Sequence, residues 1–198
     1  MLTKQEVGRQ ILHVLLGIAL VVLYYFNILT SFAVFLGIIC GGLISFISKR
    51  TNIPIFNFFL KHYERKEDLK KFPGRGMIFY FIGVLLVMQL FSKDIALAAM
   101  MVLALGDAAS HLYGAKFGKV KNIFNGDGRK LLEGTLAGAV AGFVGAVIFV
   151  PIPEAFLGSL AAMFIEVVKI DFNEKTLDDN LTVPLVAGTV MLLVRTFL

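Results

Sequence analysis

The chain has 198 residues, of which 58% are hydrophobic, and its formal net charge is +5. Soluble globular domains are about 45–50% apolar, so this composition excludes an ordinary soluble enzyme and indicates an integral membrane protein. A single cysteine, Cys40, lies in an apolar run and excludes both an internal disulfide and a cysteine-based zinc cluster. Hydrophobic stretches fill nearly the whole length, so we expect a single transmembrane domain over residues 1–198.

Apolar stretches close to the length of a bilayer-spanning helix predict about seven transmembrane helices in an all-α, polytopic fold. They cover residues 9–26, 29–48, 76–92, 95–114, 133–150, 154–169 and 181–198. Asn27 marks a tight first turn, and the prolines at 151 and 153 separate the fifth segment from the sixth. Residues 53–71 join an apolar stretch to a charged run, which predicts an amphipathic helix lying on the inner leaflet.

Basic residues predict the orientation of these segments in the membrane. Of the 19 Lys and Arg residues, only Lys93 and Arg195 fall on the side that we assign to the exterior. Lys and Arg concentrate in cytoplasmic loops, so we expect a cytoplasmic N-terminus and a C-terminus outside. This asymmetry accounts for the net positive charge without a nucleic-acid partner.

The fifth segment carries glycines at strict four-residue spacing: Gly134, Gly138 and Gly142. Small residues on one helix face let a second helix approach closely. We therefore expect this face to pack against another helix, either within the chain or across a homo-oligomer interface.

Polar side chains interrupt the apolar segments on the predicted cytoplasmic side, whereas the outer half is nearly free of charge. Asp107 is the most informative, because a carboxylate in a bilayer costs from about 3 to over 10 kcal/mol and needs a partner or a function. We expect these side chains to form a polar pocket that opens to the cytoplasm. Its carboxylates are Asp107, Glu133, Glu166, Asp178 and Asp179, and its cations are Lys116, Lys119, Arg129 and Lys130. This combination suits a magnesium nucleotide, since Mg²⁺ binds carboxylates and phosphates while Lys and Arg bind the remaining phosphate charge.

Each of these residues also has a purely structural interpretation. Asp107 could pair with a buried basic residue, and Arg9 and His13 could extend their polar ends to the interface. Glu166 could form a helix pair with Lys169, and Asn180 could cap the last helix behind a solvated loop. For His111, one turn after Asp107, a packing role is favoured.

Four motifs in chain order resemble the CTP-dependent lipid kinase family. This family includes dolichol kinases, phytol kinases and the fungal CTP-dependent diacylglycerol kinases, and it is related to the phosphatidate cytidylyltransferases. The motifs lie at Gly106–Ser110, Gly114–Lys119, Lys130–Gly138 and Asp179–Leu185, and the opening pattern Glu6, Arg9, His13 and Gly17 is also similar. Leu131 stands where the family often has a serine.

The resemblance implies phosphoryl transfer from CTP to the hydroxyl of a membrane lipid alcohol, such as a polyprenol or dolichol, with a divalent cation such as Mg²⁺. Asp107 would act as a metal ligand or as the general base toward the lipid hydroxyl. The expected catalytic residues are Asp107, Glu133, Asp179 and His13, and the expected metal ligands are Asp107, Glu133, Glu166 and Asp179. The expected nucleotide-binding residues are Arg75, Lys116, Lys119, Arg129, Lys130 and Asn180.

Three other functions compete with a lipid kinase. A cytidylyltransferase acting on a phosphorylated lipid would use similar pocket chemistry and release pyrophosphate. A transporter or scramblase would need polar residues through the full membrane thickness and favours inverted repeats, neither of which is evident in the sequence. A structural scaffold would not need five clustered carboxylates.

Overall fold

The structure is a computed structural model, and it describes residues 3–48, 50–51, 72–120, 132–167, 171–172 and 175–198. The segment 53–71, predicted to be an interfacial helix, and two predicted nucleotide-binding residues, Arg129 and Lys130, lie outside the described residues. Everything below refers to the described part of the chain.

The described chain is helical, as predicted, with one short hairpin. Its helices are α1 (Lys4–Tyr25), α2 (Ser31–Ser48), α5 (Arg75–Leu90), α6 (Lys93–Met101), the π-helix η1 (Val102–Asp107), α7 (Ala108–Phe117), α8 (Leu132–Ala146), α9 (Ile152–Val167) and α10 (Asp179–Phe197). Each of the seven predicted segments coincides with one of these helices, because α6, η1 and α7 run on as a single helix. Strands β1 (Asp171–Phe172) and β2 (Lys175–Thr176) pair antiparallel between α9 and α10, and this hairpin was not predicted.

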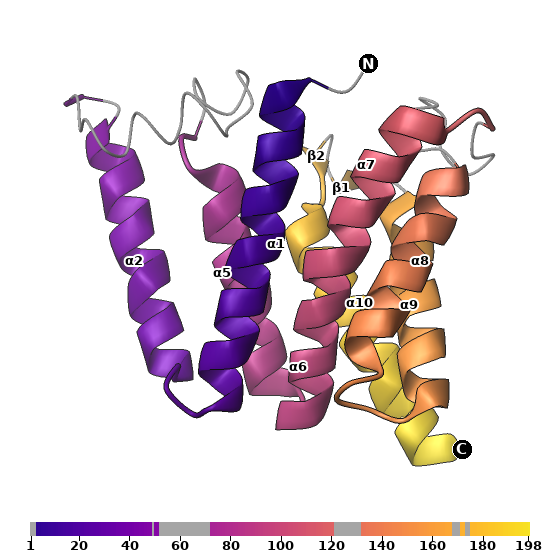
Figure 1. Cartoon of the computed structure of the whole chain (residues 1–198). Helices are drawn as coiled ribbons and strands as arrows, with labels where there is room; N and C mark the ends of the chain where they lie inside the picture. Colours follow the sequence, from indigo (N-terminus) through magenta and orange to yellow (C-terminus); the bar gives the residue numbers. More distant parts are fainter. Residues whose placement is uncertain (1–2, 49, 52–71, 121–131, 168–170, 173–174) are drawn as a thin grey trace.

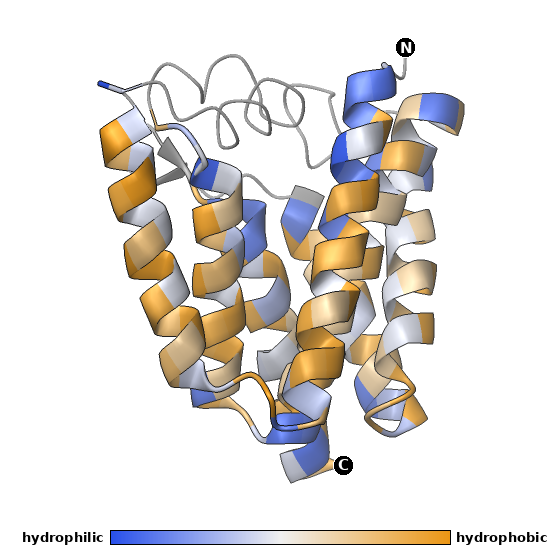
Figure 2. Ribbon diagram, turned by 60° about the vertical axis from the view of Figure 1, so that its left-hand side comes forward, coloured by the Kyte–Doolittle hydropathy of each residue, from blue (hydrophilic) through white to orange (hydrophobic). Residues whose placement is uncertain are grey.

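The helices run up and down as a bundle, with the N-terminus at one end and the C-terminus at the other (Figure 1). Four of them are long and apolar enough to cross a membrane: α1, α2, the continuous helix Lys93–Phe117, and α10. Helices α5 and α8 are apolar but shorter. The bundle is thus that of a membrane protein, while the number of seven crossings stays a prediction. Hydrophobic residues cover much of the helices, and hydrophilic ones gather near both ends (Figure 2).

The continuous helix α6–η1–α7 is the core of the bundle. Residues from Ile95 to Leu103 are almost completely inaccessible to solvent, although a helix at the edge of a bundle exposes one face. Helices α1, α5, α8, α9 and α10 all pack against parts of it. A polar residue on this helix is therefore surrounded by protein, and Asp107 lies on it.

Local sequence signals explain where the chain turns. Asn27 adopts a positive φ of 58°, a conformation that asparagine tolerates better than most residues, and it ends α1 as predicted. Pro151 precedes α9 and Pro153 lies in its first turn, where a missing N–H group costs nothing. Both predicted turns are confirmed.

The end of the bundle that carries the C-terminus holds an ion network, which differs from the expectation of a nearly uncharged outer half. Arg195 on α10 donates to both carboxylate oxygens of Glu154 on α9, at 3.1 and 2.7 Å, and lies 2.7 Å from Asp94 on α6. At the same end, the Lys93 ammonium donates to the Tyr25 carbonyl and to Asn27 Oδ1 at 2.8 and 2.7 Å. Arg195 is thus paired with two carboxylates and Lys93 with two oxygen acceptors, which is how these charges are accommodated there.

Candidate functional site: a carboxylate–histidine cluster on the central helix

Asp107 ends a π-helical turn inside the central helix, between α6 and α7. Such a turn holds one extra residue compared with an α-helix and often occurs at functional sites, because it changes the direction of the side chains around it. The Asp107 residue is 8% exposed and Gly106 beside it is buried. A buried carboxylate in this position requires polar neighbours.

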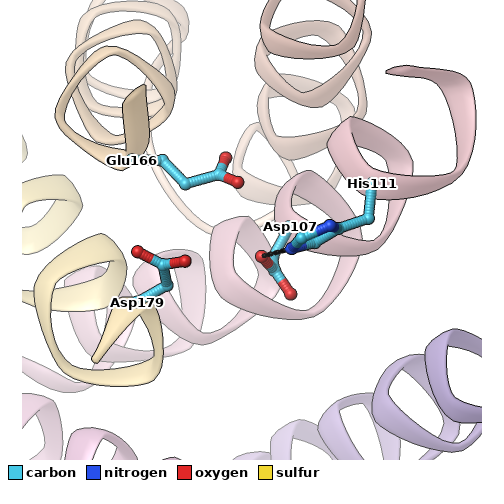
Figure 3. Close-up of side chains that lie close together, drawn as sticks. All are labelled: Asp107, His111, Glu166 and Asp179. Atoms are coloured by element: carbon cyan, nitrogen blue, oxygen red, sulfur yellow. Dashed lines mark ion pairs between the residues drawn. The ribbon is translucent and has the colours of Figure 1, made fainter. Parts of the chain in front are cut away.

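Three further side chains meet Asp107. Candidate ligand atoms of Asp107, His111, Glu166 and Asp179 all lie within 4.8 Å of one another. They come from η1, α7, the last turn of α9 and the first residue of α10, and Figure 3 shows Glu166 and Asp179 directed toward Asp107 and His111. The hairpin of β1 and β2 lies in the chain between the end of α9 and the start of α10. We call these four residues the carboxylate–histidine cluster.

Two imidazoles lie on either side of the Asp107 carboxylate. His111 Nε2 is 3.4 Å from Asp107 Oδ1, and His13 Nε2, which comes from α1, is 3.6 Å from Oδ2. His13 Nε2 also lies 3.3 Å from the Leu103 carbonyl in the π-helical turn. Each oxygen of the Asp107 carboxylate therefore has one imidazole beside it, and the two imidazoles come from different helices. These two contacts fix the orientation of the carboxylate.

Glu166 is 3% exposed and reaches the cluster from α9. Its Oε1 accepts a hydrogen bond of 3.3 Å from Ser110 Oγ, on the turn after Asp107. Lys169, with which Glu166 could form a helix pair, lies outside the described residues, so that interpretation stays open. Glu166 and Asp107 bring two carboxylates together in the protein interior.

The start of α10 is held by Asp178, one residue before the cluster member Asp179. Asp178 Oδ1 accepts from the Asn180 backbone N–H at 3.2 Å and from Asn180 Nδ2 at 2.9 Å, so Asp178, not Asn180, caps the helix. Arg75 Nε lies 3.5 Å from Asp178 Oδ2. Burial raises the pKa of the Asp178 carboxyl above its usual value, while the Asn180 hydrogen bonds and the Arg75 charge act in the opposite direction.

Small residues let the surrounding helices reach this level. A Cβ added at Gly138 would lie 2.7 Å from the Gly106 carbonyl, and one at Gly134 would lie 2.6 Å from the Ser110 carbonyl. The glycine face of α8 therefore packs directly on the central helix around Asp107, which confirms its predicted packing role within the chain. On the other side, a Cβ at Gly83 of α5 would lie 2.0 Å from the Asn180 carbonyl.

Pro184 explains why that carbonyl is available. Proline has no N–H group, so it cannot donate to the carbonyl four residues earlier, which is that of Asn180. The Asn180 carbonyl instead lies against the bare backbone of Gly83. The Asp-Asn-Leu-Thr-x-Pro motif thus combines a cluster carboxylate with a helix start that fits closely against α5.

Several predicted site residues lie away from the cluster. Glu133 Oε1 accepts from the backbone N–H groups of Lys119 and Val120, at 3.0 and 3.1 Å, just after α7 ends. The Lys116 side chain is exposed, with its ammonium 5.0 Å from the centre of the Phe117 ring, and Lys119 is exposed as well. Glu133, Lys116 and Lys119 therefore lie outside the carboxylate–histidine cluster, and Glu133 is not among the four residues that could hold a metal ion there.

The residue that sequence reasoning undervalued is His111. Its spacing of four residues from Asp107 places both side chains on one helix face, and this signal was present in the sequence. The sequence did not show that Glu166 and Asp179 come within 4.8 Å of this pair. The structure supplies the partners from other helices.

The chain is similar to two curated proteins. It is 27% identical over 158 residues to CTP-dependent diacylglycerol kinase 1 of Saccharomyces cerevisiae, and 27% identical over 157 residues to the protein of the same name from Eremothecium gossypii. The matches cover 74% and 75% of this chain but 50% and 47% of the relatives, so the chain spans about half the length of the curated relatives it matches. No family model matches the chain, and no solved structure matches it significantly. The resemblance to the CTP-dependent lipid kinase family that the motifs predict is confirmed by these two relatives.

Proposed function

We propose that this protein transfers the terminal phosphoryl group of CTP to the hydroxyl of a membrane lipid alcohol. The observation that carries the proposal is the meeting of Asp107, His111, Glu166 and Asp179 within 4.8 Å in the interior of a membrane-type bundle. The names of the two relatives support CTP as the donor and put diacylglycerol first among the acceptors to test. Isoprenoid alcohols such as polyprenol and dolichol, which the sequence motifs suggested, come next.

The donor set of the cluster fits a divalent cation. Asp107, Glu166 and Asp179 contribute three carboxylates, and hard cations such as Mg²⁺ prefer oxygen ligands. When bound, the cation would neutralise the phosphate charge of the nucleotide. Since His111 already contacts Asp107 Oδ1, we assign it to orienting that carboxylate and not to binding Mg²⁺.

Asp107 is the general base in this proposal. The lipid hydroxyl oxygen attacks the terminal phosphorus of CTP, the bond between that phosphorus and the bridging oxygen breaks, and CDP leaves with the bond electrons. The hydroxyl proton passes to the Asp107 carboxylate, which His13 and His111 hold in place. General base catalysis of this kind contributes typically about 10²–10⁴-fold to a rate.

The cations around the site are assigned to the triphosphate. Arg75 lies beside Asp178 at the start of α10. Lys116 and Lys119 lie at the rim after α7, and Glu133 fixes the backbone there. Arg129, Lys130 and Asn180 complete the predicted nucleotide-binding set. Nothing in these side chains reads the cytosine base, so the choice of CTP rests on the relatives.

The site opens to the cytoplasm in our proposal, because 17 of the 19 Lys and Arg residues fall in the segments that the sequence predicts on the side of the N-terminus. CTP would reach it from the aqueous side while the lipid tail remains in the bilayer. A site that opens on one side of the membrane distinguishes a kinase from a transporter, because the polar pathway of a transporter would continue to the other side.

One experiment tests the proposed function and its main alternative together. Purified protein in detergent micelles is incubated with diacylglycerol, a polyprenol or, in a parallel reaction, phosphatidate, and with CTP, ATP, GTP or UTP labelled at the terminal phosphate. We expect label on the lipid with CTP and Mg²⁺, and loss of transfer when the divalent cation is removed by a chelator. Release of the label as pyrophosphate would identify a cytidylyltransferase, and no transfer from any nucleotide would refute a kinase.

A further inference from the structure

The junction of α7 and α8 holds a carboxylate that lies outside the carboxylate–histidine cluster. Glu133 lies in the first turn of α8, and its Oε1 accepts from the backbone N–H groups of Lys119 and Val120 at 3.0 and 3.1 Å. Its other oxygen, Oε2, lies 3.3 Å from the same Val120 nitrogen. The side chain of Glu133 therefore ties the start of α8 to the chain just after the end of α7.

A backbone hydrogen bond strengthens this link. The Leu132 N–H group donates to the Val120 carbonyl at 3.1 Å, so Val120 is held through both its N–H and its C=O group. The described residues on either side of segment 121–131 are thus joined to each other. We call the hydrogen bonds that Glu133 and Leu132 make with Lys119 and Val120 the α7–α8 connection.

The α7–α8 connection is anchored by a close contact between two helix backbones. A Cβ added at Gly134, the residue after Glu133, would lie 2.6 Å from the Ser110 carbonyl and 3.0 Å from the Gly114 Cα. Small residues allow such a close approach of helices, and Ser110 lies one turn after Asp107. The position of Glu133 is therefore fixed relative to the part of the central helix that carries the cluster.

Two roles of the Glu133 carboxylate differ in the chemistry that they need. A general base or a Mg²⁺ ligand acts through the charge of the carboxylate. An acceptor for backbone N–H groups needs only an oxygen atom, which a glutamine side chain also provides. Both oxygens of Glu133 contact N–H groups, and Glu133 is not in the group of described residues that could hold a metal ion. These contacts favour the role of an acceptor.

We propose that Glu133 is a positioning residue for CTP, which fixes the backbone of Lys119 and Val120 and thereby places the Lys119 ammonium at the triphosphate. This inference rests on the proposed function, in which Lys119 binds phosphate. The Lys119 side chain is exposed and keeps many rotamers, so the position of its backbone decides which region its ammonium can reach. A backbone that is already ordered before CTP arrives lowers the entropy cost of binding.

The decisive comparison is Glu133→Gln with Glu133→Ala, because both variants remove the charge and only glutamine keeps an acceptor oxygen. For Glu133→Ala we expect the KM for CTP to rise about 10-fold, which corresponds to about 1.4 kcal/mol of lost binding. The KM for the lipid alcohol and the Mg²⁺ concentration for half-maximal rate should stay unchanged. Glu133→Gln should stay close to the wild-type protein in all three quantities.

Thr30→Ala is the matched control, because it removes a hydrogen bond of the same kind. Thr30 Oγ1 accepts from the Ala33 backbone N–H group at 3.2 Å, at the start of α2 and at the other end of the bundle (Figure 1). We expect neither KM to change in this variant.

Amide hydrogen exchange tests the α7–α8 connection without turnover. In detergent and without nucleotide, the N–H groups of Lys119 and Val120 should exchange faster in Glu133→Ala than in the wild-type protein, because they lose their acceptor. In Glu133→Gln they should exchange as in the wild-type protein.

The outcomes separate the positioning role from the proposed function. A wild-type protein that transfers no phosphate would refute the proposed function, and this inference with it. In an active protein, faster exchange in Glu133→Ala with an unchanged KM for CTP would overturn the positioning role alone. A Glu133→Gln variant as impaired as Glu133→Ala, or one that needs more Mg²⁺, would also overturn it, because the charge would then be required. If Glu133→Ala does not fold, Glu133→Met takes its place, since methionine keeps the side-chain length without an acceptor oxygen.

Discussion

Asp107 carries the largest share of the proposed chemistry. Replacing it with asparagine keeps the size of the side chain but removes the charge that accepts the proton. We expect Asp107→Asn to lose about 10²–10⁴-fold in phosphate transfer, the usual contribution of a general base. Initial rates with terminally labelled CTP measure this, and an unchanged elution volume in size-exclusion chromatography shows that the fold is retained. Turnover near the wild-type rate would remove Asp107 from the mechanism.

The two histidines beside Asp107 should differ in what they affect. His111 belongs to the oxygen that faces Glu166 and Asp179, so His111→Gln should raise the Mg²⁺ concentration needed for half-maximal rate by about 10–100-fold. His13 belongs to the other oxygen, so His13→Gln should lower the rate at saturating Mg²⁺ without changing that requirement. A Mg²⁺ titration of both variants measures the difference. Identical titration curves would contradict the assignment of different roles to the two Asp107 carboxylate oxygens.

At the scale of residues, the sequence was sufficient to find Asp107, Glu166 and Asp179, because a carboxylate in an apolar segment is costly enough to need an explanation. The sequence could not show that Glu133 lies outside the cluster, because its expected depth in the membrane is the same. In the structure, Glu133 contacts backbone groups after α7. Depth along a helix can be counted from sequence, whereas the direction of a side chain around the bundle axis depends on which helices are neighbours.

Among the helices, the contact of α5 with the start of α10 places Asp179. A Cβ at Gly83 would lie 2.0 Å from a backbone carbonyl, so Gly83→Ala must push α10 away. We expect a loss of about 1–3 kcal/mol in stability, as for other overpacked cores, together with lower activity. Gly37→Ala in α2 is the matched control, since nothing lies within 4 Å of its added Cβ. Thermal unfolding in detergent compares the two, and equal midpoints would contradict the close contact.

The helices were predictable and the irregular elements between them were not. Long apolar runs specify helices in a membrane, because every backbone group must be satisfied within its own segment. The π-helical turn at Val102–Asp107 leaves the hydrophobic pattern intact, so nothing in the sequence signals the extra residue. The hairpin of β1 and β2 is too short to produce a strand pattern.

Across the whole molecule, the ion network of Arg195, Glu154 and Asp94 links α10, α9 and α6 at the end opposite the cluster. Glu154 is 6% exposed, and Arg195→Gln would leave it buried without its cation. We expect a loss of up to about 3 kcal/mol in stability, because breaking a buried ion pair is costly while Arg195 itself is partly solvated. The double variant Glu154→Gln with Arg195→Gln should recover part of that loss. Detergent unfolding measures both variants, and a double variant no better than the single one would argue against the pairing.

The predicted orientation of the bundle rests on charge alone, and it can be tested with the single native cysteine removed. In a Cys40→Ala background, Ile148→Cys places a thiol in the turn between α8 and α9, and Lys4→Cys places one at the start of α1. Both positions are exposed and lie toward opposite ends of the bundle. Because basic residues favour the cytoplasmic side, a membrane-impermeant maleimide added to intact cells should label only the Ile148→Cys protein, and permeabilised cells should show both. Labelling of Lys4→Cys in intact cells would turn the cluster toward the exterior, where no CTP is supplied, and the proposed reaction would lose its donor.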